Sequence, residues 1–147
     1  IEIRPGKAFV KLIHPIRPPG TTGLDVNEMS IVMKAGFGAC SVLFTGDIGK
    51  AAEQMLSKDD VRSTVLKVAH HGGRYSSSAG FIDKVRPSVA VVSVGRYNQF
   101  GHPHAETLER YGAAGIRLLR TDMDGAVTVV TDGGECSISG HLTQGER

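Results

Sequence analysis

The chain has 147 residues, of which 17 are Lys or Arg and 15 are Asp or Glu, and its formal net charge is +2. This length suits one domain or a piece of one. No apolar run approaches the roughly 18–20 residues of a membrane-spanning helix. The small net charge gives no electrostatic indication of a nucleic-acid partner. The chain contains 19 glycines, nearly twice the usual ~7%, which indicates many tight loops.

Apolar runs along the chain predict strands that alternate with helices. Residues 8–13 form a strand, and a loop rich in proline and glycine follows, so that residues 1–26 lead into the main fold. We then expect, in chain order, a β-hairpin of residues 30–33 and 40–44, a helix over 48–56, a strand over 65–69, a helix over 76–85, a strand over 89–94, a helix over 103–111, and two strands, 116–120 and 126–130, around the Asp124-Gly125 turn. Residues 132–147 should form a frayed polar tail. This order predicts an α/β fold with a hairpin at its front.

The cysteines lie far apart, at Cys40 and Cys136, among apolar or small residues. Neither has a second cysteine at metal-ligand spacing. We therefore expect two free thiols in the core.

Polar residues suited to chemistry come directly after the predicted strands. They are Asp47 after 40–44, His70 and His71 after 65–69, Asn98 and His102 after 89–94, and Asp122 and Asp124 after 116–120. Loops at the carboxyl ends of strands converge in α/β folds, so we expect these side chains to form a site. A carboxylate with histidines offers the ligand types for Zn, Mn or Fe.

Each of these residues also has a structural interpretation. Asp47 could cap the helix that follows it. The pair His70 and His71 could serve only as hydrogen-bonding groups at a glycine turn, and Asn98 and His102 could be turn residues. None of them specifies a site when it is taken alone.

Three further features are left out of the predicted site. Lys67 alternates with Val68 along its strand and is expected to face away from His70. Gly46 to Lys50 ends in Gly-Lys but lacks the other residues of a phosphate-binding P-loop. His102-Pro103-His104 has His-x-His spacing, but the Asp-His that completes a dinuclear ligand motif does not follow.

The ordered combination of blocks is more specific than any single block. The blocks are Asn27-x-x-Ser30, Leu43-Phe44-Thr45-Gly46-Asp47, Leu66-Lys67-Val68-Ala69-His70-His71-Gly72-Gly73, Asn98-x-x-Gly101-His102-Pro103 and Arg120-Thr121-Asp122-x-x-Gly125. This series resembles the metallo-β-lactamase-fold domain at the C-terminal end of the ComEC family, the competence channels that take up DNA. The resemblance covers residues 27–131.

The resemblance implies a metal site. In related hydrolases the Asp of the Thr-Gly-Asp block bridges two metals, which gives that role to Asp47, and either His70 or His71 would ligate the second metal. The complete domain would hold two divalent ions, Zn or Mn. Asn27 stands where many relatives carry a ligand histidine, so a complete three-histidine first site is not expected.

The resemblance also implies a substrate-facing loop. His102 would contact or protonate a phosphate, and Asn98 would steady the phosphate or the leaving group. Asn27, Asn98 and Gly72 are expected to face the substrate.

The signature His-x-His-x-Asp-His of this fold is absent from the 147 residues. In the family it lies upstream of the point that matches Asn27. The chain is therefore interpreted as the C-terminal half of an αββα sandwich, with few or no metals of its own. Half a sandwich would expose an apolar sheet face, so we expect dimerisation, a swapped pairing or a separate N-terminal half.

Three functions are left open by the sequence. The first is metal-dependent phosphodiester hydrolysis of incoming DNA, single-stranded or at a duplex end. The resemblance places such a domain in a polytopic membrane channel protein, on its extracytoplasmic face. The second is hydrolysis of a small ester or phosphodiester by the same fold, and the third is a non-catalytic docking domain of the uptake channel.

Overall fold

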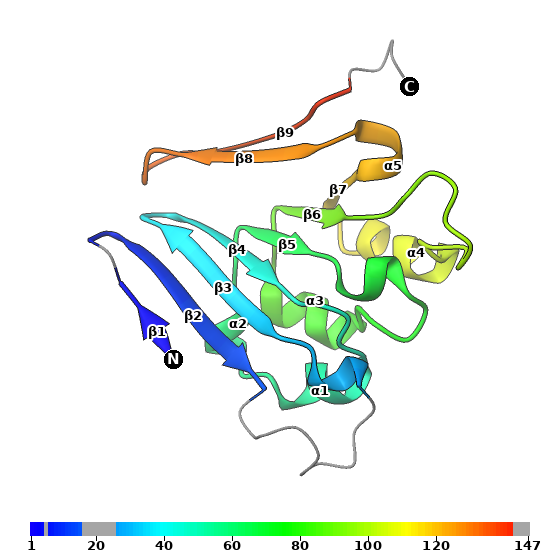
Figure 1. The fold of residues 1–147 in the computed structure, drawn as a ribbon, viewed down its shortest axis with the longest axis horizontal. Coiled ribbons are helices and arrows are strands. Elements are labelled where there is room, and N and C mark those ends of the chain that lie inside the picture. The colour runs from blue at the N-terminus through cyan, green and yellow to red at the C-terminus, as the bar shows by residue number, and fades with distance from the viewer. Residues whose placement is uncertain (5, 16–25, 143–147) are drawn as a thin grey trace.

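The computed structural model describes residues 1–4, 6–15 and 26–142 (Figure 1). Seven strands form one sheet in chain order: β1 (Glu2–Ile3), β2 (Ala8–His14), β3 (Val32–Phe37), β4 (Cys40–Phe44), β5 (Val65–Lys67), β6 (Val89–Val92) and β7 (Arg117–Arg120). Strands β1 to β4 are antiparallel to their neighbours, and β4 to β7 run parallel. The predicted mixed α/β fold is confirmed, and it is compatible with part of a metallo-β-lactamase-like sandwich.

Short helices connect the strands. They are η1 (Asn27–Met29), α1 (Lys50–Met55), α2 (Lys58–Val61), η2 (Ala69–Gly72), α3 (Ala79–Val85), α4 (Ala105–Ala113) and α5 (Thr121–Asp124). Figure 1 shows α1, α2 and α3 against one side of the sheet. Leu43, Leu66 and Ala90 of the central strands are fully buried, and they belong to one core cluster with Phe81 and Val85 of α3. This core fixes the ends of β4, β5 and β6.

Alternate residues of the same strands face the other side of the sheet. Val42, Val65 and Val91 line an apolar groove of about 470 Å³, and β8 (Val127–Thr131) contributes Val127 and Val129 to it. The sheet face that the sequence predicted to be bare is therefore partly covered by β8. Dimerisation or swapped pairing of the chain stays a prediction.

The predicted hairpin at the front is confirmed, with longer strands than expected. β3 continues to Phe37, so only Gly38 and Ala39 remain as the turn. Gly38 has a φ of +58°, and a Cβ at this position would lie 1.9 Å from the carbonyl oxygen of Gly133. Ala39 also donates its N–H to that carbonyl at 2.8 Å, which joins this turn to the turn after β8.

Three predictions about the C-terminal third and the cysteines are wrong. The polar tail contains β9 (Cys136–Gly140), which pairs with β8 in a separate two-stranded sheet. The segment 116–120 and the segment 126–130 do not pair around Asp124-Gly125, because β7 joins β6 instead. Cys40 and Cys136 form a disulfide rather than free thiols, because β9 brings Cys136 beside the start of β4.

The remaining boundaries differ by small amounts. The helix predicted over 103–111 begins at Ala105 and ends at Ala113, so Gly112 lies inside it. Ser78 caps α3, since its hydroxyl accepts the N–H of Phe81 at 3.3 Å. β2 belongs to the main sheet, and the proline- and glycine-rich loop that follows it lies, for residues 16–25, outside the described residues.

Candidate functional site

The carboxyl ends of three parallel strands bring the predicted polar residues to one edge of the sheet. Asp47 lies in the turn after β4, the two histidines lie in η2 after β5, and the loop with Asn98 and His102 follows β6. These strands are neighbours, so their turns emerge side by side. A cleft of about 370 Å³ opens at this edge, with Asp47, His70 and His102 in its lining.

Asp47 faces one cationic side chain and one imidazole. Its Oδ1 lies 3.6 Å from Nε2 of His71 and 3.8 Å from Nζ of Lys67. Lys67 also donates to the carbonyl oxygen of Gly46 at 3.1 Å. Burial lowers the pKa of Lys67, and the nearby charge of Asp47 opposes that effect. The carboxylate is thus held at the mouth of the cleft without being neutralised by a tight ion pair.

His71 is oriented by the strand next to it. Its Nδ1 lies 2.7 Å from the carbonyl oxygen of Ser93, which can only accept, so Nδ1 carries the proton of this hydrogen bond. In the neutral imidazole, Nε2 then presents a lone pair toward Asp47. Two hydrogen-bond acceptors face each other, which is the arrangement that a shared proton or a bound cation satisfies.

Histidine rings gather around His102. Its ring centroid lies 5.5 Å from that of His70, 6.4 Å from that of His71 and 5.0 Å from that of His104. Burial lowers the pKa of His102, and the neighbouring histidines add to this effect. A neutral His102 at pH 7 is a poor proton donor, so contact with a phosphate suits it better than protonation of one.

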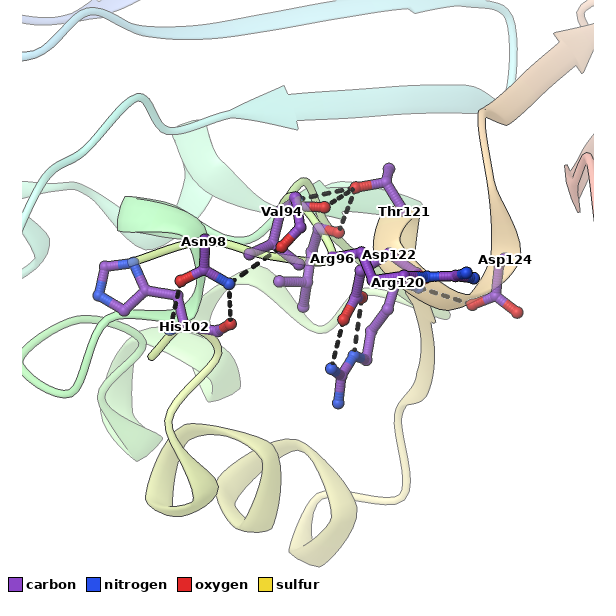
Figure 2. Close-up of polar contacts among 10 residues, drawn as sticks. Val94, Arg96, Asn98, His102, Arg120, Thr121, Asp122 and Asp124 are labelled. Atoms are coloured by element: carbon purple, nitrogen blue, oxygen red, sulfur yellow. Dashed lines mark hydrogen bonds and ion pairs between the residues drawn. The ribbon is translucent and has the colours of Figure 1, made fainter. Parts of the chain in front are cut away.

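Asn98 holds the loop that carries His102. Its side-chain amide donates to the carbonyl oxygens of Gly95 at 3.0 Å and His102 at 2.8 Å, and its Oδ1 accepts the N–H of His102 at 2.9 Å. Figure 2 shows this amide closed onto the loop beside the His102 ring. Asn98 is therefore a positioning residue in this structure, since both ends of its amide are used inside the loop.

The block of Arg120, Thr121 and Asp122 also has a structural role at this loop. The Thr121 hydroxyl accepts the N–H of Val94 at 2.7 Å and donates to its carbonyl at 2.8 Å (Figure 2). Arg96 donates through Nε to the carbonyl oxygen of Asp122 at 3.2 Å. Arg120 and Asp122 form a two-bond ion pair, with N–O distances of 3.1 and 2.7 Å. The base of the loop is thereby fastened to the end of β7.

The donor set fits one part of a metal site. Asp47 and His71 offer two opposed acceptors, and His104 adds a buried Nδ1 that has no hydrogen-bond partner. Within residues 1–4, 6–15 and 26–142, however, no group of three or more His, Cys, Asp or Glu side chains is placed to hold a metal ion. A tight site would need further donors.

Comparison with known proteins identifies related sequences. No protein-family model matches the chain. The chain is 34% identical over 116 residues to ComE operon protein 3 of Bacillus subtilis, which is 78% of this chain and 15% of that protein. It is 38% identical over 115 residues to the competence protein ComA of Neisseria gonorrhoeae, covering 76% and 17%. It is 36% identical over 103 residues to recombination protein 2 of Haemophilus influenzae, covering 70% and 13%. The chain belongs to the ComEC family of competence proteins.

The ComEC-family match concerns a limited segment of each relative, since the chain spans 13 to 17% of the length of these three proteins. None of the helices in the described part of the chain has the length and apolar character needed to cross a bilayer.

Of two residues predicted to face the substrate, Asn27 lines the cleft and Gly72 does not. Asn27 is exposed on η1 and lines the cleft. Gly72 is buried, and a Cβ there would lie 2.5 Å from Cβ of Pro103, while Gly73 rather than Gly72 lines the cleft. Gly72 also has a φ of +82°. It allows η2 to pack against the His102 loop.

Three residues of the site were missed by sequence reasoning. Lys67 lies on the expected face of β5, but its long side chain extends to Asp47 around the end of the strand. Glu28 accepts the backbone N–H groups of Gly49 and Ala52, at 3.1 and 2.8 Å, and so holds the start of α1 just after Asp47. His104 lines the cleft. The sequence pointed to His104 through the His-x-His spacing of residues 102–104, but this spacing is not part of a complete ligand motif.

Proposed function

We propose that this chain forms the C-terminal part of a metal-dependent phosphodiesterase domain that hydrolyses DNA in a competence-type uptake system. The pair of Asp47 and His71 carries this proposal, because a carboxylate oxygen and an imidazole nitrogen 3.6 Å apart are ligand types that a divalent ion can bind together. The relatives named for competence support the biological setting. The resemblance to the ComEC family supports a membrane channel protein as the larger assembly, with this domain on its extracytoplasmic face.

A divalent ion bound at such a site supplies an activated water and an electrophile for the phosphate. Asp47 and His71 would hold it, and the carbonyl of Ser93 keeps Nε2 of His71 free for that purpose. Position 27 is an asparagine rather than a ligand histidine. The remaining metal ligands would therefore come from outside the described residues. Lys67 places a positive charge beside Asp47 and limits the negative potential that would repel a phosphate.

The other side chains of the cleft position the substrate. His102 is mostly neutral at pH 7, so it offers one N–H group and one lone pair to a phosphate oxygen or to water. Asn98 acts through the loop and sets the position of His102. Arg74 lies at the rim, where its exposed guanidinium can pair with a phosphate.

The test is cleavage of labelled DNA by the purified protein with Mn²⁺ or Zn²⁺, compared with the same reaction in a chelator. Metal-dependent cleavage supports the proposal. Cleavage of nitrophenyl esters without cleavage of DNA would favour a small-molecule hydrolase. DNA cleavage that continues unchanged in the chelator would contradict the proposal.

A further inference from the structure

Three aromatic side chains of the described residues are more than three-quarters exposed. Tyr75 is 83% exposed, Tyr97 is 91% exposed and Phe100 is 77% exposed. An exposed apolar residue alone needs no explanation, but large flat rings gathered at one place indicate a binding surface. All three lie in the two loops that flank the histidines of the candidate site.

The two loops meet at His102. Tyr75 lines the cleft of about 370 Å³ that contains Asp47. Phe100 lines an adjoining hollow with His71 and His102, and its ring lies over that of His102 at a centroid distance of 5.9 Å and an interplanar angle of 28°. His102 belongs to both hollows. Tyr75 and Phe100 thus lie in two hollows that share His102, and Tyr97 lies three residues before Phe100 in the same loop.

An arginine precedes each tyrosine. Arg74 pairs with Glu106 at 3.3 Å, but both side chains are about half exposed, so water screens this pair and a phosphate can compete for the guanidinium. Lys50 is exposed and lines a hollow with Arg74 and Tyr75. Alternation of cations with flat rings matches the alternation of phosphates and bases in a nucleic-acid strand.

The loop of Tyr97 and Phe100 is held at its base. The contacts of Val94 and Arg96 with Thr121 and Asp122 fasten one end, and the Asn98 amide closes the other (Figure 2). Rings carried on a fastened loop lose little conformational freedom when they stack on a ligand. The loop is thus built to present these rings to the solvent rather than to bury them.

We infer that Tyr75, Tyr97 and Phe100 form a stacking platform for unpaired nucleotides, so that the site takes single-stranded nucleic acid. This inference rests on the proposed function for its ligand class. Bases in a duplex have both faces covered by neighbouring bases, and only unpaired bases can stack on protein rings. Lys50 and Arg74 are among the few cations that line the hollow beside Tyr75, so few phosphate contacts accompany stacking there and the dependence of the affinity on salt should be shallow.

The test is binding of a fluorescent oligothymidylate of about 16 nucleotides, measured by anisotropy in EDTA so that no cleavage occurs. The triple variant Tyr75→Ala, Tyr97→Ala, Phe100→Ala should bind at least about tenfold more weakly. The ring-retaining variant Tyr75→Phe, Tyr97→Phe, Phe100→Tyr should bind within about twofold of the wild type, because the stacking faces remain. Val130→Ala, which trims an exposed apolar residue of β8, serves as the matched control.

Equal binding by the wild type and the triple alanine variant would overturn the inference. So would an equal loss of affinity for a duplex of the same length, or ring-dependent binding to anionic lipid vesicles without binding to the oligonucleotide. The stacking platform and the metal-dependent hydrolase are tested by different measurements, so either one can be contradicted without the other. Ring-dependent binding of the oligonucleotide by the wild type in EDTA, with no metal-dependent cleavage, would support the platform and contradict the hydrolase.

Discussion

Nε2 of His71 and Oδ1 of Asp47 lie 3.6 Å apart, at the ends of two adjacent parallel strands. The hydrogen bond from Nδ1 of His71 to Ser93 fixes which nitrogen faces the carboxylate. Of the two histidines, His71 is therefore the one that a hydrogen bond orients with Nε2 toward Asp47. The sequence alone did not distinguish His70 from His71.

His71→Ala should weaken the binding of Mn²⁺ to the protein at least about tenfold, because a metal-ligating imidazole held by a carbonyl is removed. His70→Ala should have a smaller effect, since the His70 ring lies edge-on to that of His102, with the ring centroids 5.5 Å apart. Isothermal titration with Mn²⁺ measures both variants. Equal effects of the two substitutions would contradict the assignment of His71.

Glu53→Ala should reduce the free energy of unfolding by about 2–4 kcal/mol. The Glu53 carboxylate is 1% exposed and accepts the backbone N–H groups of Ser77 and Ser78, of which Ser77 is fully buried. Its removal leaves those groups without a partner. Urea unfolding provides the measurement, and Glu109→Ala, at an exposed position of α4, is the control. A change as small as that of the control would show that these hydrogen bonds contribute little.

Asp122→Asn should lower the melting temperature at neutral pH and have little effect in acid. The hydrogen bonds from Arg120 lower the pKa of Asp122 below its ordinary value of 3.8. A depressed folded-state pKa adds stability above the unfolded-state pKa, and this stability is lost as the pH falls through the folded-state value. The difference between wild type and variant should thus be constant from pH 7 to about pH 5 and shrink below about pH 4. Calorimetry across this range checks it, and a difference independent of pH would count against the ion pair.

Reduction of the Cys40–Cys136 disulfide should destabilise the protein by about 2–4 kcal/mol, because the bond closes a long loop of the unfolded chain. Thermal unfolding with and without a phosphine reductant gives the difference. The double variant Cys40→Ser, Cys136→Ser should be insensitive to the reductant. An unchanged melting temperature of the wild type on reduction would be the opposite result.

The parts of the fold predicted correctly follow from local patterns. The apolar run over 89–94 is a signal carried by neighbouring residues. Asp47 and the histidine pair were placed at one edge of the sheet because parallel strands leave their carboxyl ends together.

The parts that were missed depend on long-range pairing or side-chain length. β9 alternates Cys136 and Ile138 with serines, which is a strand pattern, but its polar composition favoured a tail. Without β9 the disulfide could not be predicted, since nothing local places Cys136 near Cys40. Lys67 was excluded on strand alternation alone, although a lysine side chain is long enough to pass the end of a short strand.

DNA cleavage by the Asp47→Asn variant shows whether Asp47 helps this domain hydrolyse phosphodiester bonds with a divalent metal. This variant keeps the size of the side chain and removes its charge. With Mn²⁺, we expect cleavage of a labelled single strand by the wild type and by Asp83→Asn, which alters an exposed carboxylate of α3. Cleavage by Asp47→Asn should fall by about 100-fold or more, with the melting temperature preserved. Unchanged cleavage by a folded Asp47→Asn protein would show that the Asp47 carboxylate has no part in the reaction.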